Sequence, residues 1–384
     1  MEDEKYPFFT EEHGMLRQTL REFMEKEVIP NGDTWDEEGW IPAEVVRKLG
    51  DMGMLGLRFP EEYGGNDADY WSTVVLIEEI SRGFINGLMS IVGVHSEIVL
   101  PALVHFATEE QKQKYLVPGI KGEKIGALAI TEPEAGSDVA SIRSFAVKDG
   151  DSYVLNGNKI FITNGARADF LVVAAKTDRD AGAKGITQFI VDKEMPGFEV
   201  ARKLDKAGLR TSDTAELFFT DVRIPESNVL GQVGQGFYQI MANFQPERLL
   251  IAVAAVAGSD YGLQVTLDYI KERKQFGRTI SSFQAVKHRF AEMATENEAA
   301  RELTYRACDM YNRGVDCTRE VSMAKWYSTE VANRVAYQCQ QLFGGYGYMM
   351  EYPIQRGWRD GRIATVVGGT TEIMKELIAR SYGM

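Results

Sequence analysis

The spacing of hydrophobic positions changes twice along the chain. From about residue 10 to residue 124, apolar residues recur at steps of three and four, as they do on one face of a helix. Between residue 125 and about residue 224, short β-branched runs follow one another at a spacing of about ten residues, which indicates strands. From Gly236 to the end the helical spacing returns. The expected order is therefore helices, then strands, then helices.

This order predicts an α+β fold that is mainly α. We expect an N-terminal helical domain (1–124), a middle antiparallel β-barrel-like domain (125–232) and a C-terminal four-helix bundle (233–384). A β-domain inserted between two helical halves leaves a cleft in which a large flat ligand can lie.

Local signals predict several element boundaries. Thr10 is a candidate N-cap, and Pro30 is expected to end the helix that starts there. The pairs Asn156-Gly157 and Asn164-Gly165 predict tight turns between strands. Gly231–Gly236 lacks the spacing of a dinucleotide-binding fingerprint and is interpreted as a loop before a helix.

The stretch Phe244–Ala252 places Glu247 and Arg248 inside an otherwise apolar run, directly after Pro246. Proline favours the first helical position, so a helix is predicted to begin here with Glu247 in its first turn. The apolar stripe that follows comprises Leu249, Val253 and Val256. A carboxylate at the entry to so apolar a helix would be desolvated and become a candidate base. As a first-turn residue, Glu247 would equally well complement the helix dipole.

Composition narrows the class of protein. A net charge of −13 and a pI near 5.0 argue against nucleic acid as the main partner. No run of about 18 consecutive apolar residues is present, so no membrane span is expected. The acidic start lacks the features of a signal or transit peptide, which favours a cytoplasmic, reducing location. Cys308, Cys317 and Cys339 lack metal-ligand spacing, and no metal site is predicted.

Two stretches in the β-region could hold a cofactor. Ala129–Asp138 leaves a strand for a loop of hydroxyls and free backbone N–H groups, which suits the polar edge of a planar cofactor or a phosphate. In Lys159–Asn164, strand alternation places Phe161 and Thr163 on one face. Each stretch is also consistent with ordinary structure, as a strand exit and as a core Phe beside an edge Thr.

Three helix ends in the C-terminal half carry glycines or cations. Arg273 and Phe276 could provide a phosphate contact and an adenine platform, although a cation also favours a helix C-terminus. Gln341–Gly345 and Gly368–Glu372 would allow close backbone approach to a ligand, as plain helix capping also would.

Taken together, these residues resemble the acyl-CoA dehydrogenase family over nearly the whole chain. The densest matches are AITEPEAGSD at 129–138 and the block from Gln341 to Arg380. The resemblance is strongest to the branch of long-chain and isovaleryl-CoA enzymes, which carry their base on a helix.

The resemblance implies FAD bound between the β-domain and the C-terminal bundle of a homotetramer or dimer. Implied FAD contacts are Ile130, Thr131, Gly136, Ser137, Phe161, Ile162, Thr163, Arg273, Phe276, Gln284, Gln341, Gly344, Gly345, Thr370 and Glu372. Six of these, from Arg273 to Gly345, would reach the adenine dinucleotide of a neighbouring subunit. Implied acyl-CoA contacts are Ser137, Ala183, Lys184, Tyr238, Arg248, Gly368 and Gly369. Phe161 stands where many relatives have Trp.

The implied reaction is α,β-dehydrogenation of an acyl-CoA thioester to the trans-2-enoyl-CoA. A base removes the α-proton while the β-hydrogen leaves as hydride to flavin N5. Most relatives carry that base at the position of Gly368, whereas the helix-base branch has it at the position of Glu247. Two carboxylates in one dry site would repel each other, so Glu247 is expected to be the base.

The implied electron acceptor is an electron-transfer flavoprotein. Alternatives are an enoyl-CoA-type reductase or a dehydrogenase of a CoA thioester outside fatty-acid oxidation, and more remotely a non-catalytic acyl-CoA-binding scaffold. A mitochondrial matrix location would apply to a eukaryotic source. Chain-length preference depends on pocket depth, which the sequence does not show.

Overall fold

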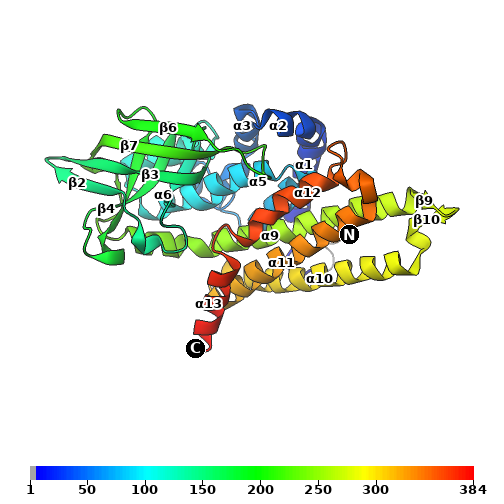
Figure 1. Ribbon diagram of the computed structural model, residues 1–384. Helices are drawn as coiled ribbons and strands as arrows, with labels where there is room; N and C mark the ends of the chain where they lie inside the picture. The colour runs from blue at the N-terminus through cyan, green and yellow to red at the C-terminus, as the bar shows by residue number, and fades with distance from the viewer. Residues whose placement is uncertain (1–5) are drawn as a thin grey trace.

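The computed structural model describes residues 6–384. The expected order of helices, strands and helices is confirmed (Figure 1). The N-terminal helices are α1 (Glu11–Phe23), α2 (Gly32–Glu38), α3 (Ala43–Asp51), α4 (Tyr70–Ile80), α5 (Asn86–Val92), α6 (Leu100–Phe106), α7 (Glu109–Gln111) and α8 (Val117–Ile120). Thr10 caps α1, because its side chain accepts a hydrogen bond from His13 N while the His13 ring accepts one from Thr10 N.

Pro30 does not end the first helical segment. A π-helical turn (Met24–Val28) and a 3₁₀ turn (Ile29–Asn31) lead directly from α1 into α2. Proline lies within the first two residues of the 3₁₀ turn, where its missing N–H is not needed for helical hydrogen bonding.

The middle region is a mixed sheet. Its strands are β1 (Gly126–Ala129), β2 (Phe145–Asp149), β3 (Ser152–Thr163), β4 (Phe170–Lys176), β5 (Ile186–Asp192), β6 (Phe198–Lys203), β7 (Thr214–Pro225) and β8 (Val229–Leu230). Their order is β6-β7-β3-β2-β4-β5-β8, and β1 pairs with β4. Most pairs are antiparallel, but β1 and β2 both run parallel to β4, so the expectation of a wholly antiparallel sheet was too simple.

Asn156-Gly157 is not a turn. Both residues lie inside β3, at a register shift between Leu155 and Gly157 in its pairing with β7. Gly157 has φ +149°, and a Cβ atom there would overlap Ser144, so this glycine permits an irregularity within one long strand. Asn164-Gly165 does form a turn, with Asn164 at φ +65°.

The C-terminal region consists of long helices joined by short connections. They are α9 (Gly236–Glu272), α10 (Gln284–Asn312), α11 (Thr318–Phe343), α12 (Ile354–Gly361) and α13 (Thr371–Ser381), with the small hairpin β9 (Lys274–Gln275) and β10 (Arg278–Thr279) after α9. Figure 1 shows α9 running from beneath the β-domain to this hairpin at the opposite end of the molecule.

Pro246 lies inside α9 and does not begin a helix. The segment expected to start at Pro246 is continuous with the preceding helical segment from Gly236, so Glu247 is not a first-turn residue. An internal proline removes one helical hydrogen bond. Burial of Leu249, Val253 and the following apolar stripe against α11 outweighs that local cost.

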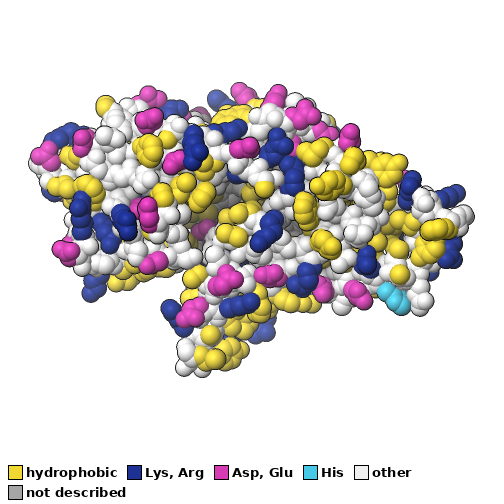
Figure 2. Space-filling model, viewed as in Figure 1, with side chains coloured by type: hydrophobic (Ala, Val, Ile, Leu, Met, Phe, Trp, Pro, Cys, Tyr) yellow, Lys and Arg dark blue, Asp and Glu magenta, His cyan; other side chains and the backbone are white. Residues whose placement is uncertain are grey.

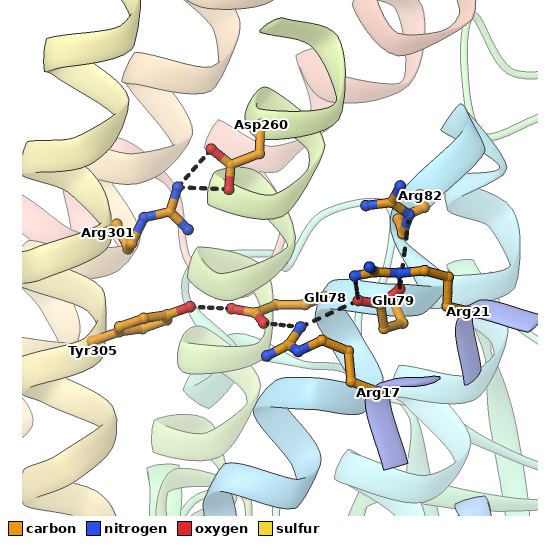
Figure 3. A network of polar contacts seen from close by, with 8 residues as sticks. All are labelled: Arg17, Arg21, Glu78, Glu79, Arg82, Asp260, Arg301 and Tyr305. Atoms are coloured by element: carbon orange, nitrogen blue, oxygen red, sulfur yellow. Dashed lines mark hydrogen bonds and ion pairs between the residues drawn. The ribbon is translucent and has the colours of Figure 1, made fainter. Parts of the chain in front are cut away.

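A polar network attaches the N-terminal helices to the bundle (Figure 3). Arg17 and Arg21 of α1 pair with Glu78 and Glu79 of α4 at 2.6–3.2 Å. The hydroxyl of Tyr305 in α10 donates to Glu78. One turn earlier in α10, Arg301 pairs with Asp260 of α9 at 2.6 Å. These contacts link α1 to α4, α4 to α10, and α10 to α9.

Two helical segments are long and apolar enough to cross a membrane by length and composition alone, 86–106 and α9. In their most apolar windows, 78% and 61% of the residues are buried inside the protein. Both therefore act as core helices here. The three cysteines are free and buried, and no group of three or more His, Cys, Asp or Glu among residues 6–384 is arranged to hold a metal ion.

Candidate active site

A buried ion pair fixes the loop that leaves β1. Lys159 Nζ of β3 lies 2.7 Å from Glu132 Oε1 and donates to the carbonyl of Ile130 at 2.8 Å. Burial opposes ionisation of Glu132, but the charge of Lys159 and the hydrogen bonds that Glu132 accepts lower its pKa. The N–H of Ile160 also donates to Thr131 O at 3.0 Å. Thr131 is thereby held beside the end of β3.

Phe161 lies at the end of β3 with an exposed ring. It lies within a second register shift, between Lys159 and Ile162, has φ +62° and is 65% exposed, whereas the neighbouring Ile162 is buried. A positive φ is costly for a bulky residue, and an apolar ring in water gains nothing from folding. Such a ring is a candidate platform for a planar ligand, and Thr163 is half-buried next to it.

The other candidates of the β-domain lie in two loops that meet. Gly136 and Ser137 are exposed in the loop before the 3₁₀ turn Val139–Ser141, and this turn packs against the 3₁₀ turn Gly182–Gly185, which contains Ala183 and Lys184. The latter turn also contacts α9, on which Tyr238 is 48% exposed. Figure 2 shows a hollow between the β-domain and the C-terminal helices, and the contact between the turn Gly182–Gly185 and α9 crosses the same boundary.

Glu247 of α9 faces Gly368 of the loop before α13. A Cβ atom added to Gly368 would lie 3.5 Å from Glu247 Oε1, so a larger residue there would compete with this carboxylate for space. Gly368 has φ +63°, a conformation that side-chain-bearing residues rarely adopt. The structure thus brings together two positions that are 121 residues apart in the sequence.

The environment of Glu247 suits a proton acceptor. Glu247 is half-buried, and burial raises its pKa from 4.5 to about 7, against the opposing charges of Arg248 and Lys325. A carboxylate with such a pKa can take a proton near neutral pH. Arg248 is itself buried and donates through Nε to Gly368 O at 3.4 Å.

The rest of this loop is held from both sides. Gly369 has φ +99°, and its carbonyl accepts a hydrogen bond from Lys325 Nζ of α11 at 2.5 Å. Thr370 caps α13 by accepting from Ile373 N, and Glu372 lies exposed in the first turn.

An apolar cavity of about 110 Å³ adjoins this site. It lies among α5, α9, α11 and α12, and its lining includes Phe84, Met89, Ile251, Ala254, Gly258 and Val367. Ile251 and Val367 are close to Glu247 and Gly368, and Gly258 lies two turns further along α9. The cavity therefore begins beside Ile251 and Val367 and extends into the core of the bundle.

A second cavity, of about 570 Å³, lies at the distal end of α9. Arg273, Gln341, Gly344 and Gly345 line it, together with the aromatic residues Tyr269, Phe343 and Tyr346. A Cβ atom at either Gly344 or Gly345 would meet no other atom within 4 Å, so the backbone is open to a ligand. A cation, an amide and exposed backbone suit a phosphate-linked adenosine, so the residues present fit the dinucleotide part of FAD.

Two of the predicted FAD contacts do not line this cavity in the part of the chain that the structure describes. Phe276 is 92% exposed in the β9–β10 turn, and Gln284 is exposed at the start of α10. The distal cavity lies at the C-terminal end of α9, whereas the β-domain that contains β3 lies over the N-terminal part of this helix (Figure 1), so the predicted FAD contacts form two separate groups within one chain.

Sequence reasoning missed Lys325, Ile251, Glu132 and Lys159. Lys325 occupies an otherwise apolar or small face of α11, with Val321, Ala324 and Ser328 as buried neighbours along the helix. A single lysine on such a face is a signal that could have been used. Ile251 gave no such signal, since it is one apolar residue among many.

Three family models match the chain. The acyl-CoA dehydrogenase N-terminal domain matches residues 10–123, the middle domain matches residues 127–222 and the C-terminal domain matches residues 234–383.

Individual relatives agree with these models. An acyl-CoA dehydrogenase of Bacillus subtilis is 41% identical, covering 97% of this chain and 98% of its own. The mitochondrial long-chain specific acyl-CoA dehydrogenase of Sus scrofa is 42% identical, covering 97% of this chain and 86% of its own. The crystal structure of an acyl-CoA dehydrogenase from Geobacillus kaustophilus superposes with a TM-score of 0.96 at 45% identity, over 98% of this chain and all of the other.

Proposed function

The chain belongs to the acyl-CoA dehydrogenase family, and from that membership we propose that it converts an acyl-CoA thioester to the trans-2-enoyl-CoA with Glu247 as base. Members of this family are FAD-dependent oxidoreductases that act on CH–CH groups. The observation that carries the assignment of the base is the position of Glu247 opposite Gly368, in surroundings that raise its pKa to about 7.

Each site residue has a proposed task. The carboxylate of Glu247 takes the α-proton. The N–H of Gly368 donates to the thioester oxygen and so stabilises the negative charge that develops there. Arg248 orients the loop through the Gly368 carbonyl. Bound FAD supplies the acceptor for the β-hydrogen, which leaves as hydride with its electron pair. The acyl chain enters the cavity beyond Ile251.

The surrounding contacts are proposed on the same basis. The CoA portion would be held by Ser137, Ala183 and Lys184, which lie in or beside two 3₁₀ turns that contact each other, and by Tyr238 of the neighbouring α9. The β3 end, with Thr131, Phe161 and Thr163, would hold the flavin, and Thr370 and Glu372 would close on it from the other side. The distal cavity would take the adenine dinucleotide of a second subunit, because it lies far from the β3 end of its own chain.

We further propose an electron-transfer flavoprotein as electron acceptor, a homotetramer or dimer, and a cytoplasmic location. A solved structure described as an electron transferring flavoprotein of Acidaminococcus fermentans is among the neighbours, and relatives occur in bacteria. The division into domains 1–124, 125–232 and 233–384 is also proposed.

The test is anaerobic reduction of the FAD-loaded protein by a panel of straight, branched and aromatic acyl-CoAs. We expect the yellow colour to bleach with at least one of them and the enoyl-CoA product to appear. Glu247→Gln should keep FAD and bind acyl-CoA but lose nearly all turnover, whereas Glu44→Gln, an exposed glutamate of α3, should behave as the parent does. Protein that takes up no FAD, or a Glu247→Gln variant within a few-fold of the parent, would reject the proposal.

A further inference from the structure

The turn Gly368–Gly369 is held by two cations from two different helices. Arg248 of α9 donates to the Gly368 carbonyl at 3.4 Å, and Lys325 of α11 donates to the Gly369 carbonyl at 2.5 Å. Since each peptide unit is planar, holding these two oxygens fixes the two peptide planes that follow the Gly368 N–H. Two successive glycines with positive φ would otherwise have wide conformational freedom.

Lys325 is unusual as a structural residue. Its side chain is fully buried, and within residues 6–384 the Gly369 carbonyl is the acceptor that lies within hydrogen-bond distance of its ammonium. No carboxylate of the described chain forms an ion pair with it within 4 Å. A buried ammonium without such a pair costs stability, and an apolar residue of similar length would fill the same space at lower cost.

The charged groups around Lys325 come from three helices. Glu247 and Arg248 approach from α9, Glu330 lies on α11 itself, and Glu372 lies on α13. Burial and the charge of Arg248 lower the pKa of Lys325 to about 8, while the three carboxylates oppose that change. The ammonium form therefore persists at neutral pH. Glu247 is faced by Arg248 of its own helix and by Lys325 across the helix interface.

We propose that Lys325 is a positioning residue of the reaction site, which fixes the Gly368–Gly369 turn through the Gly369 carbonyl and, with Arg248, favours the ionised form of Glu247. This inference rests on the proposed function, in which the Gly368 N–H holds the thioester oxygen and Glu247 takes the proton. Lys325 touches neither the proton nor the substrate and acts through the turn and through its charge.

The two parts of this role have different chemical requirements, both of which an ammonium group meets. Fixing the turn requires a hydrogen-bond donor at the end of the side chain, whereas favouring the carboxylate of Glu247 requires a positive charge. Burial raises the pKa of Glu247, and Lys325 partly offsets this effect. Loss of the charge should therefore raise the pKa of Glu247 further, and loss of the donor should loosen the turn.

Two variants separate these requirements. Lys325→Gln removes the charge and retains a donor, and Lys325→Met removes both. We expect the acidic limb of the pH profile for flavin reduction by acyl-CoA to move upward by about one pH unit in both variants. Hydrogen exchange of the segment 366–370 should be faster in Lys325→Met and close to that of the parent in Lys325→Gln. Lys121→Gln, at an exposed lysine, serves as the control for charge removal alone.

The outcomes are distinct. Acidic limbs that superimpose on that of the parent would overturn the electrostatic part, and parental hydrogen exchange in Lys325→Met would overturn the positioning part. If Lys325→Met fails to fold, Lys325→Gln alone decides the electrostatic part, and Lys325→Leu replaces Met in the exchange measurement. If the parent is reduced by no acyl-CoA, the proposed function fails, while hydrogen exchange still tests the contact with the turn.

Discussion

Gly368 leaves open the space that the carboxylate of Glu247 uses, since a Cβ atom at Gly368 would lie 3.5 Å from Glu247 Oε1. The same Cβ atom would overlap Cδ1 of Ile251. A carboxylate could therefore be supplied from position 368 in place of position 247 only if the side chain of Ile251 made room for it.

Moving the base to residue 368 should therefore require a change at Ile251. We expect Glu247→Gly with Gly368→Glu to remain nearly inactive, because the new side chain meets Ile251 and the backbone there has φ +63°. Adding Ile251→Val removes only Cδ1 and should raise turnover about tenfold over the double variant. Glu247→Gly with Ile251→Val, lacking the new glutamate, is the control. Equal activity of the double and triple variants would contradict the role of Ile251.

Glu247 should make the protein less stable as the pH rises. Its folded pKa of about 7 exceeds the ordinary 4.5, so the folded state binds more protons in that window and the free energy of unfolding falls from pH 4.5 to 7. Because the group is partly exposed, we expect a total of about 2 kcal/mol. Glu247→Gln should be more stable than the parent by that amount at pH 8 and equal near pH 4.5. Denaturant unfolding of both proteins at pH 8 and pH 4.5 checks this. A stability difference between parent and variant that is the same at the two pH values would contradict it.

Gly258 should control the length of the acyl group. A Cβ atom at this position meets no atom within 4 Å, and the residue lines the apolar cavity about three turns beyond Glu247. Gly258→Leu should fold and fill the far part of the cavity. We expect kcat/KM to fall about tenfold or more for a long straight acyl-CoA and to change less than about threefold for a four-carbon one. A uniform fall for both substrates would place the acyl chain elsewhere.

The Lys159–Glu132 pair should matter for FAD retention. Lys159→Met leaves the Glu132 carboxylate buried without its cation, at a cost of about 3–5 kcal/mol. Because this pair fixes the loop carrying Thr131, the variant should be purified with less FAD and a lower melting temperature. Adding Glu132→Gln removes the unpaired charge and should recover part of the melting temperature. FAD content and stability equal to those of the parent in Lys159→Met would contradict this role.

The sequence predicted the order of the helical and strand regions, but it did not predict that α9 and β3 are each one unbroken element. Local rules place a helix start at Pro246 and a turn at Asn156-Gly157. In the folded chain both positions lie within longer elements, because burial along α9 and pairing of β3 with β7 outweigh local preference. Strand β2, with two charged residues among five, gave too weak a pattern to be recognised.

The candidate site was predictable where residues form a dense local pattern, as in AITEPEAGSD, or where a glycine replaces an expected carboxylate, as at Gly368. The contacts that hold these residues were not predictable. The distance from Lys325 to Gly369, and the overlap that Ile251 imposes on residue 368, depend on how α9, α11 and the terminal loop pack in space.

The unbroken course of α9 has a consequence for insertions and deletions. Glu247, about a third of the way along α9, and Arg273 at its end are about 39 Å apart along one helix axis, and Glu247 faces Gly368 while Arg273 lines the distal cavity. One residue inserted between them would shift the distal end by about 1.5 Å and turn it by about 100°. Sequences that share this architecture should therefore vary in composition between these positions while keeping the same number of residues.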